Sequence, residues 1–156
     1  MEPQDLVRAL AAAVERRDGF AAAALFTEDG VYDDVFYGRF AGRDRIAALI
    51  EDRFYRDARE FRWDMHDPLT DGRMLYARYV FSYRSTLAGA PPGRVVFEGV
   101  AIVRLRDGEI AEYSEIADTA PALASLGFAA ERVVKLLHRQ AAVLRDRPEA
   151  ARHVAD

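Results

Sequence analysis

The sequence predicts an α+β fold, in which helices lie apart from a mostly antiparallel sheet. Apolar residues recur at helical spacing near both ends of the 156-residue chain. Between about residues 61 and 118 they alternate with polar residues instead, as they do in half-buried strands. Two Asp-Gly pairs, at 71–72 and 107–108, mark tight turns within that part. This segregation of helices and strands is typical of α+β domains.

Helices and strands can be placed in order from this pattern. Three helices are expected near the N-terminus, at residues 5–17, 20–26 and 43–55. Five strands are expected, at residues 31–36, 61–69, 73–86, 95–105 and 109–118. Asp5 is expected to cap the first helix, residues 27–30 to end the second, and residues 37–42 to form a loop.

The C-terminal part is expected to be helical. A short helical turn is predicted at 121–127 and an amphipathic helix at 129–145, which Pro148 ends before a frayed terminus. We therefore expect a domain at 1–120 and a helical extension at 121–156 that packs on the same domain.

Composition argues against several classes of protein. The net charge of −4 and the lack of a basic stripe argue against binding to nucleic acid. The chain has no cysteine, and its three histidines are scattered, so no metal site is predicted. No motif demands a cofactor, so none is expected. No signal peptide and no uninterrupted apolar run of membrane-spanning length is visible, so we expect a cytoplasmic protein without a membrane segment.

Two adjacent carboxylates lie in the first predicted strand. Neighbouring residues of a strand point to opposite faces, so one of Asp33 and Asp34 should point inward. A buried carboxylate is costly unless it is hydrogen-bonded or has a chemical role. This strand is therefore the first place to look for a site.

The order of elements carries a resemblance, together with the segments ALFTEDGVYDD, Gly-x-x-x-Gly-Arg-Asp-x-Ile and DGEIAEYSEIAD. Residues 6–118 resemble the nuclear transport factor 2-like superfamily, and within it the SnoaL-like and ketosteroid isomerase-like branch. The resemblance implies a cone-shaped fold, with the N-terminal helices packed in a curved sheet and a mostly apolar pocket at the mouth. It also implies a homodimer through the sheet.

The resemblance also suggests which residues form the site. Asp34 falls where the ketosteroid isomerases place their general base. Ala101 and Leu10 occupy the positions of the two oxyanion donors of those enzymes, so steroid isomerisation is rejected. The epoxide hydrolases have an Arg and an Asp two residues apart on the long strand and a second acid on the last strand. In this chain the long-strand acid is missing, and only the last-strand acid remains, as Glu115. The histidine of the dehydratases falls at Arg62 or Trp63, and the SnoaL-like cyclases are the nearest functional analogy.

Candidate site residues follow from the resemblance and from strand alternation. The candidate catalytic residues are Asp34, Glu115 and Tyr113. The candidate ligand-binding residues are Tyr32, Trp63, Phe97, Gly99, Ala101 and Val103. Each has a structural alternative: Asp34 could bind backbone amides, Glu115 could be an exposed charge that pairs with Arg104 or Arg78, and the aromatic residues could be core.

Three functions are compatible with these residues. The first is a cofactor-free isomerase, cyclase or lyase that uses Asp34 as the base on a small apolar carbonyl compound. The second is a non-catalytic binder of an apolar metabolite, and the third is a protein–protein interaction module. A homodimer is expected through the sheet face that the pocket does not use, formed by Tyr76, Arg78, Glu98, Val100, Ile102 and Arg104.

Overall fold

The structure is a computed structural model that describes residues 1–155. It is an α+β fold built on one curved, six-stranded sheet with the order β2-β1-β6-β5-β4-β3. The strands are β1 Phe26–Asp34, β2 Gly38–Ala41, β3 Ala58–Thr70, β4 Met74–Ser85, β5 Val95–Arg106 and β6 Glu109–Asp118. All neighbouring strands are antiparallel except β1 and β6, which are parallel.

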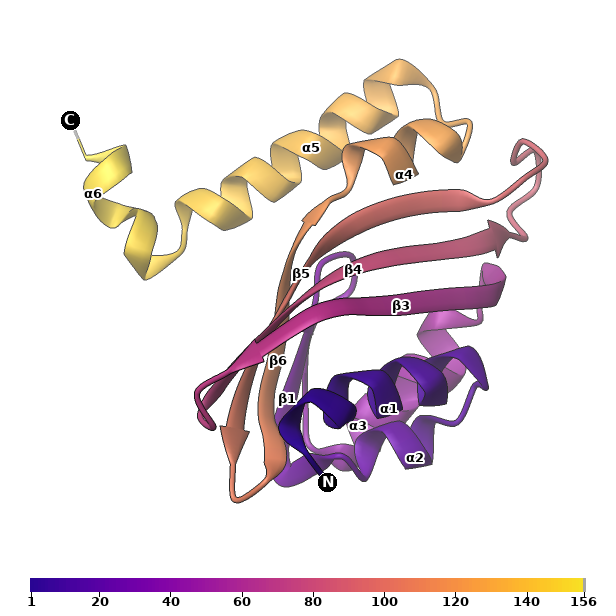
Figure 1. Ribbon diagram of the computed structural model, residues 1–156. Helices are drawn as coiled ribbons and strands as arrows, with labels where there is room; N and C mark the ends of the chain where they lie inside the picture. Colours follow the sequence, from indigo (N-terminus) through magenta and orange to yellow (C-terminus); the bar gives the residue numbers. More distant parts are fainter. Residues whose placement is uncertain (156) are drawn as a thin grey trace.

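The N-terminal helices fill the concave side of this sheet, which gives the predicted cone (Figure 1). They are α1 Pro3–Glu15, α2 Gly19–Ala23 and α3 Arg43–Ala48, which continues into the π-helical segment η1 Leu49–Phe54. The apolar stripe of α1 is buried, with Leu10 and Val14 fully enclosed. The sequence also predicts a core of Leu25, Phe26, Ile46, Ile50, Phe97, Val103 and Leu105. All of these are buried except Leu25, which is only partly enclosed.

The N-terminal boundaries differ from the predicted ones in two places. The first helix begins at Pro3 after the N-cap residue Glu2, and Asp5 lies in its first turn. Residues 27–30 do not form a break between elements but belong to β1, whose pairing with β6 is irregular between Phe26 and Val31. Gly30 accommodates this irregularity, because a Cβ there would lie 2.9 Å from Phe26 Cβ. A bulged strand of this kind lacks the alternation by which strands are recognised.

Three short elements, in two stretches of the chain, were not predicted. Residues 38–41 form β2, which pairs with β1 through Tyr32 and Phe40, where a loop was expected. Residues after Pro148 form the short helical segments η2 Pro148–Ala150 and α6 Ala151–Val154, where fraying was expected. None of the three buries a full apolar face, so the sequence carries little periodic signal for them.

Two further helices, α4 and α5, follow the last strand of the sheet. Helix α4 (Ala120–Ser125) packs on β5 and buries Ala122 and Leu123. Helix α5 (Ala130–Arg145) follows and buries no residue. It contacts α4, and the hydroxyl of Thr119 lies 2.7 Å from the Gln140 side-chain oxygen. The attachment of α5 to the domain is therefore slight. None of the described helices is both long enough and apolar enough to cross a membrane.

Candidate functional site

Asp34 ends β1 and points into the cone. Its side chain is 7% exposed, and its Oδ1 accepts hydrogen bonds from the backbone amides of Phe36 (2.9 Å) and Tyr37 (2.8 Å). The structural alternative considered for Asp34 is thus present: the carboxylate holds the turn between β1 and β2. No described residue donates a hydrogen bond to Oδ2, so that oxygen remains available.

Glu115 lies on β6, where it pairs with Ala101 of β5. Its carboxylate is close to that of Asp34. Its Oε2 accepts hydrogen bonds from the hydroxyls of Tyr79 (2.6 Å) and Tyr113 (3.2 Å), and its Oε1 accepts from the backbone amide of Val35 (3.2 Å). It forms no ion pair with Arg104 or Arg78, which pair with Glu112 and Asp67 instead. The alternative of an exposed, arginine-paired Glu115 is therefore wrong.

The two carboxylates together bind three consecutive amides. Glu115 accepts from Val35, and Asp34 accepts from Phe36 and Tyr37. This satisfies the donors of a turn that has no other backbone partners. It also fixes both carboxyl groups against the same short segment. We call Asp34, Tyr79, Tyr113 and Glu115 the carboxylate cluster.

Burial changes the protonation of the carboxylate cluster. Burial is the largest cause of the shift at Asp34, followed by the charge of Glu115, while the amide hydrogen bonds act in the opposite direction. The result is a rise in the pKa of Asp34 from 3.8 to about 7. Burial also raises the pKa of Glu115, although the bonds from Tyr79, Val35 and Tyr113 oppose that rise.

The tyrosines of the cluster are held in their neutral form. Burial, followed by the charge of Glu115, raises the pKa of Tyr79 and of Tyr113 far above the usual value. A neutral phenol keeps its O–H donor, so both tyrosines can donate to a carboxylate at neutral pH. The cluster thus combines two acids of raised pKa with two neutral donors.

Aromatic rings enclose the cluster. The ring centroid of Tyr32 lies 4.5 Å from that of Tyr113, and Trp63 meets Tyr79 and Tyr113 edge-on, each at 6.0 Å. Trp63 is only 4% exposed. Its indole Nε1 is enclosed and has no hydrogen-bond partner among the described residues. A buried donor without a partner costs free energy, so this N–H is a candidate contact for a ligand oxygen.

The inward residues of β5 are placed as their alternation predicts. Phe97, Ala101 and Val103 are buried on the same face, and Ala101 and Val103 are fully enclosed. Gly99 also faces inward, but the space above it is filled by Tyr79, whose hydroxyl would lie 2.6 Å from a Cβ at that position. The interior of the cone is therefore occupied largely by aromatic side chains.

Tyr79 was not among the predicted site residues. It lies on β4 between the inward residues Ala77 and Phe81, so alternation alone places it inside. Its contact with Glu115 depends on the pairing of Tyr79 with Gly99 across β4 and β5. That register could not be read from the sequence.

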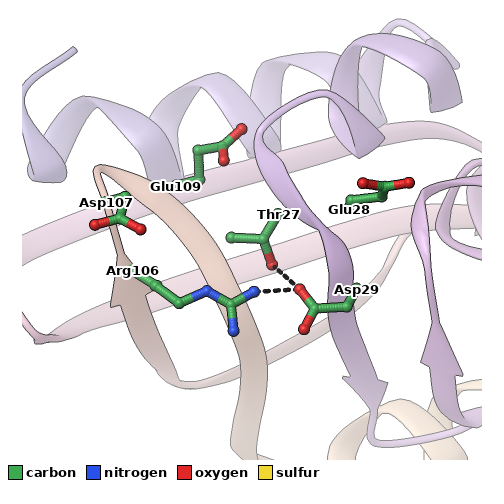
Figure 2. A pocket seen from close by; sticks show the side chains of 6 residues that line it. All are labelled: Thr27, Glu28, Asp29, Arg106, Asp107 and Glu109. Carbon is green, nitrogen blue, oxygen red and sulfur yellow. Dashed lines mark hydrogen bonds and ion pairs between the residues drawn. The ribbon is translucent and has the colours of Figure 1, made fainter.

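Two hollows lie away from the cluster. One, of about 520 Å³, is lined by Thr27, Glu28, Asp29, Arg106, Asp107 and Glu109, and Figure 2 shows Asp29 bound by Arg106 and Thr27. The other, of about 300 Å³, lies between α1 and β3 and includes Trp63 and His66. The first is too polar for an apolar ligand, and neither is lined by Asp34 or Glu115. Within residues 1–155, no group of three His, Asp or Glu side chains is arranged to hold a metal ion.

Solved structures of similar fold come from several bacteria. A Catenulispora acidiphila protein with a ketosteroid isomerase-like fold, in complex with trimethylamine, has a TM-score of 0.72 at 23% identity, over 81% of this chain and 95% of that one. A Xanthomonas campestris protein, proposed to be a polyketide cyclase, has a TM-score of 0.63 at 26% identity, over 80% and 96%. An LEH-like epoxide hydrolase from M. tuberculosis has a TM-score of 0.65 at 22% identity, over 88% and 96%.

The sequence comparisons give the family. No curated protein matches the chain. Residues 7–113, which run from α1 to Tyr113 of β6, match the SnoaL-like domain. The match includes Asp34 and Tyr113 and ends two residues before Glu115. The predicted superfamily is therefore confirmed, and the chain belongs to the SnoaL-like domain family.

Proposed function

We propose that the protein is a cofactor-independent acid–base enzyme, an isomerase, cyclase or lyase, that acts on a small apolar carbonyl compound. The observation that carries this proposal is the pair of inward carboxylates, Asp34 and Glu115, held against one turn among aromatic rings. A base works best when its pKa lies near the working pH, and the pKa of Asp34 is raised to about 7. Membership of the SnoaL-like family supports the same reading.

Asp34 is the proposed base. Its Oδ1 is occupied by two amides, while Oδ2 has no donor among the described residues. Oδ2 would take a proton from the carbon next to the substrate carbonyl, and the C–H electron pair would move to form an enolate. In an isomerase, the same proton would return to a different carbon, so that no atom is gained or lost.

An enolate oxygen needs a hydrogen-bond donor. The hydroxyls of Tyr79 and Tyr113 already donate to Glu115, whereas Trp63 Nε1 has no partner. We assign the indole N–H as the donor to the ligand oxygen, since a positioned donor at a developing charge lowers the barrier. Glu115 would then hold the tyrosines in place, and in its protonated form it could act as the acid.

Access to Asp34 depends on the turn that follows it. Phe36 and Tyr37 are about half exposed, and their rings meet Phe97 at 5.6 Å and Phe54 at 5.9 Å. The proposal requires that this turn opens when a ligand binds. Such an opening would break the hydrogen bonds from the backbone amides of Phe36 and Tyr37 to Asp34. Both carboxylate oxygens of Asp34 would then be free.

The filled interior favours a second candidate function, a protein interaction module without catalysis. Large apolar residues remain exposed on the opposite face of the sheet, among them Val100 (38%) and Ile116 (62%). In that case the carboxylate cluster would be a structural network. The two functions differ in whether Asp34 moves a proton of a bound molecule.

Deuterium exchange in D₂O tests the proposal directly. The probe is 2-decalone, a small bicyclic ketone, and the loss of its α-proton signals is followed by NMR. We expect the native protein to accelerate exchange, Asp34→Asn to lower the rate at least about 100-fold, and the matched control Asp33→Asn to change it little. Trp63→Phe should also slow the exchange while leaving the pKa of Asp34 unchanged.

Two results would overturn the catalytic proposal. One is exchange that is no faster with the native protein than with Asp34→Asn for 2-decalone, 2-tetralone and cyclohexenone. The other is a loss of exchange in Asp33→Asn alone. Because Trp63 is the only tryptophan, its fluorescence reports binding separately. A probe that quenches Trp63 without exchange would identify a non-catalytic binder.

A further inference from the structure

Helix α5 has an apolar face that the rest of the chain covers only in part. Val134, Val143 and Leu144 are 50%, 57% and 54% exposed, and no residue of the helix is buried. Most apolar residues of the helix lie along one side of it. The helix also lies outside residues 7–113, the part shared with the SnoaL-like family. Its apolar face therefore lies outside the part of the chain that matches the family.

A second uncovered apolar surface lies on the sheet, on the face directed away from the core. We call it the outer patch, formed by Tyr76, Val100, Ile102 and Ile116. The members are neighbours across β4, β5 and β6, because Val100 pairs with Ile116 and Tyr76 pairs with Ile102. Contiguous exposed apolar surface of this kind marks an interaction site.

The exposed area of the chain supports a missing partner. The chain exposes 9394 Å² at a mass of 17.5 kDa. A compact monomer of that mass exposes about 7,900 Å², roughly 1,500 Å² less. A stable interface removes about 800 Å² or more from each partner. The excess is therefore large enough for a stable dimer interface on every copy.

Charge also matches between the two surfaces. Helix α5 carries four basic side chains, Arg132, Lys135, Arg139 and Arg145, against one acid, Glu131. One edge of the outer patch carries a row of exposed acids, Asp64, Glu98 and Asp118, which are aligned through Val80. Arg78 and Arg104 also lie on this face, where they pair with Asp67 and Glu112. The basic side chains of α5 can therefore pair with the acids at that one edge.

Helix α5 does not pack on the outer patch of its own chain, because its main contacts are with α4 and not with a strand. Figure 1 shows α5 on the side of the sheet opposite to α1, α2 and α3, which is also the side of the outer patch. The Thr119–Gln140 contact and the stacking of Arg132 on Phe128, at 3.8 Å, hold it in that position. A second copy can cover both surfaces at once by a two-fold exchange, because each copy offers one of each.

We propose that α5 is a dimerisation arm, which lies on the outer patch of a second copy of this chain. Basic amphipathic helices also bind membrane surfaces. A membrane would leave the outer patch uncovered, and the apolar face of α5 contains no Trp or Phe within Ala130–Arg145. The second copy is therefore the better occupant.

Sedimentation equilibrium of the full chain at micromolar concentration is the first test. The native protein should have twice the chain mass of 17.5 kDa. Val143→Glu combined with Leu144→Glu should raise the dissociation constant at least about 100-fold, with an unchanged circular dichroism spectrum. Ala142→Glu, which adds the same charge on the polar side of α5, should leave the dimer intact. A native monomer, or a double variant that stays dimeric, overturns the proposal.

Cross-linking identifies which surfaces meet. The chain has no cysteine, so Val143→Cys chains mixed with Ile116→Cys chains can form a disulfide only between the two introduced positions or between like copies. We expect a mixed dimer after mild oxidation, and little with Ala142→Cys in place of Val143→Cys. An intramolecular disulfide in the double variant, without the mixed dimer, would place α5 on its own sheet and overturn the proposal. A native monomer that floats with phosphatidylglycerol vesicles would assign the helix to membranes instead.

Discussion

The hydroxyl of Tyr79 lies 2.6 Å from Oε2 of Glu115 and donates a hydrogen bond to it. The two residues come from β4 and β6, which are separated by β5, so the contact crosses a whole strand. It is possible because the strand between them carries Gly99, whose missing side chain leaves room for the tyrosine ring. This contact links the position of the second carboxylate to the packing of the sheet.

Removing this hydroxyl should change the protonation of Glu115. The bond from Tyr79 lowers the pKa of Glu115, so Tyr79→Phe should raise that pKa further above its usual value. The variant should also lose roughly 1–3 kcal/mol of stability near neutral pH, since the bond is made to a charged group. NMR titration of the glutamate carboxyl carbons and urea unfolding measure both effects. Tyr83→Phe, on the same strand, is the control and should leave Glu115 unchanged.

Gly99→Ala should displace the Tyr79 ring. A Cβ at residue 99 would lie 2.6 Å from both the Tyr79 hydroxyl and the Ile116 carbonyl oxygen, which is closer than real contacts allow. We expect a loss of about 1–3 kcal/mol in urea unfolding, as for other overpacked cores. In Gly99→Ala with Tyr79→Phe, the two losses should be less than additive. Strict additivity would show that Gly99 and Tyr79 are not coupled.

Phe26 is a test of the core rather than of the site. The residue is fully buried at the start of β1, and its ring lies 6.0 Å from that of Tyr32. Phe26→Ala should cost about 3–5 kcal/mol of the free energy of unfolding. Phe20→Ala is the matched control, because Phe20 is 75% exposed and its removal should cost almost nothing. Equal melting temperatures for the two variants would contradict this packing.

Asp34 should weaken the fold in a pH-dependent way. Its pKa is raised in the folded state from 3.8 to about 7, so its charged form disfavours folding. The cost is absent below 3.8, grows as the pH rises towards 7, and is complete above that value. Asp34→Asn keeps an oxygen for the two amides and removes the charge. The variant should therefore be more stable than the native protein at neutral pH, by up to a few kcal/mol, and the gain should vanish in acid.

Urea unfolding of both proteins from acid to neutral pH measures this difference. Asp33→Asn is the control and should show no such trend. If Asp34→Asn were strongly destabilised at neutral pH while Asp33→Asn stayed silent, Asp34 would be a structural acceptor of the turn amides. The proposal of a catalytic base would then lose its support.

Periodic pattern was sufficient for much of this structure. The stripe of α1 and the alternation of β5 and β6 fixed which side chains point inward, and this placed Tyr113 and Glu115 on one face without any coordinates. The same alternation required only that one of Asp33 and Asp34 point inward, and the family resemblance singled out Asp34. The assignment of Asp34 as a base came from the same resemblance.

What could not be predicted depends on contacts between distant residues. Tyr79 reaches Glu115 because it pairs with Gly99 across β4 and β5, and this register could not be read from the sequence. The irregular start of β1 follows from the close approach of Gly30 to Phe26, which has no periodic signature. The amphipathic pattern of α5 predicted an apolar face but not what covers it. The periodic pattern of apolar residues indicates which face of a helix or strand is apolar. It does not indicate how two strands are aligned or what covers an apolar face, because these depend on residues that are distant in the sequence.

The most direct test of the central claim is the pKa of Asp34 itself. Titration of the aspartate carboxyl carbons by NMR, with Asp34→Asn to assign the signal, should show a midpoint near 7. In Glu115→Gln the midpoint should fall, because the charge of Glu115 is the second-largest cause of the rise. A midpoint near the ordinary value of 3.8, unchanged in Glu115→Gln, would contradict the account and leave Asp34 as a turn-binding carboxylate.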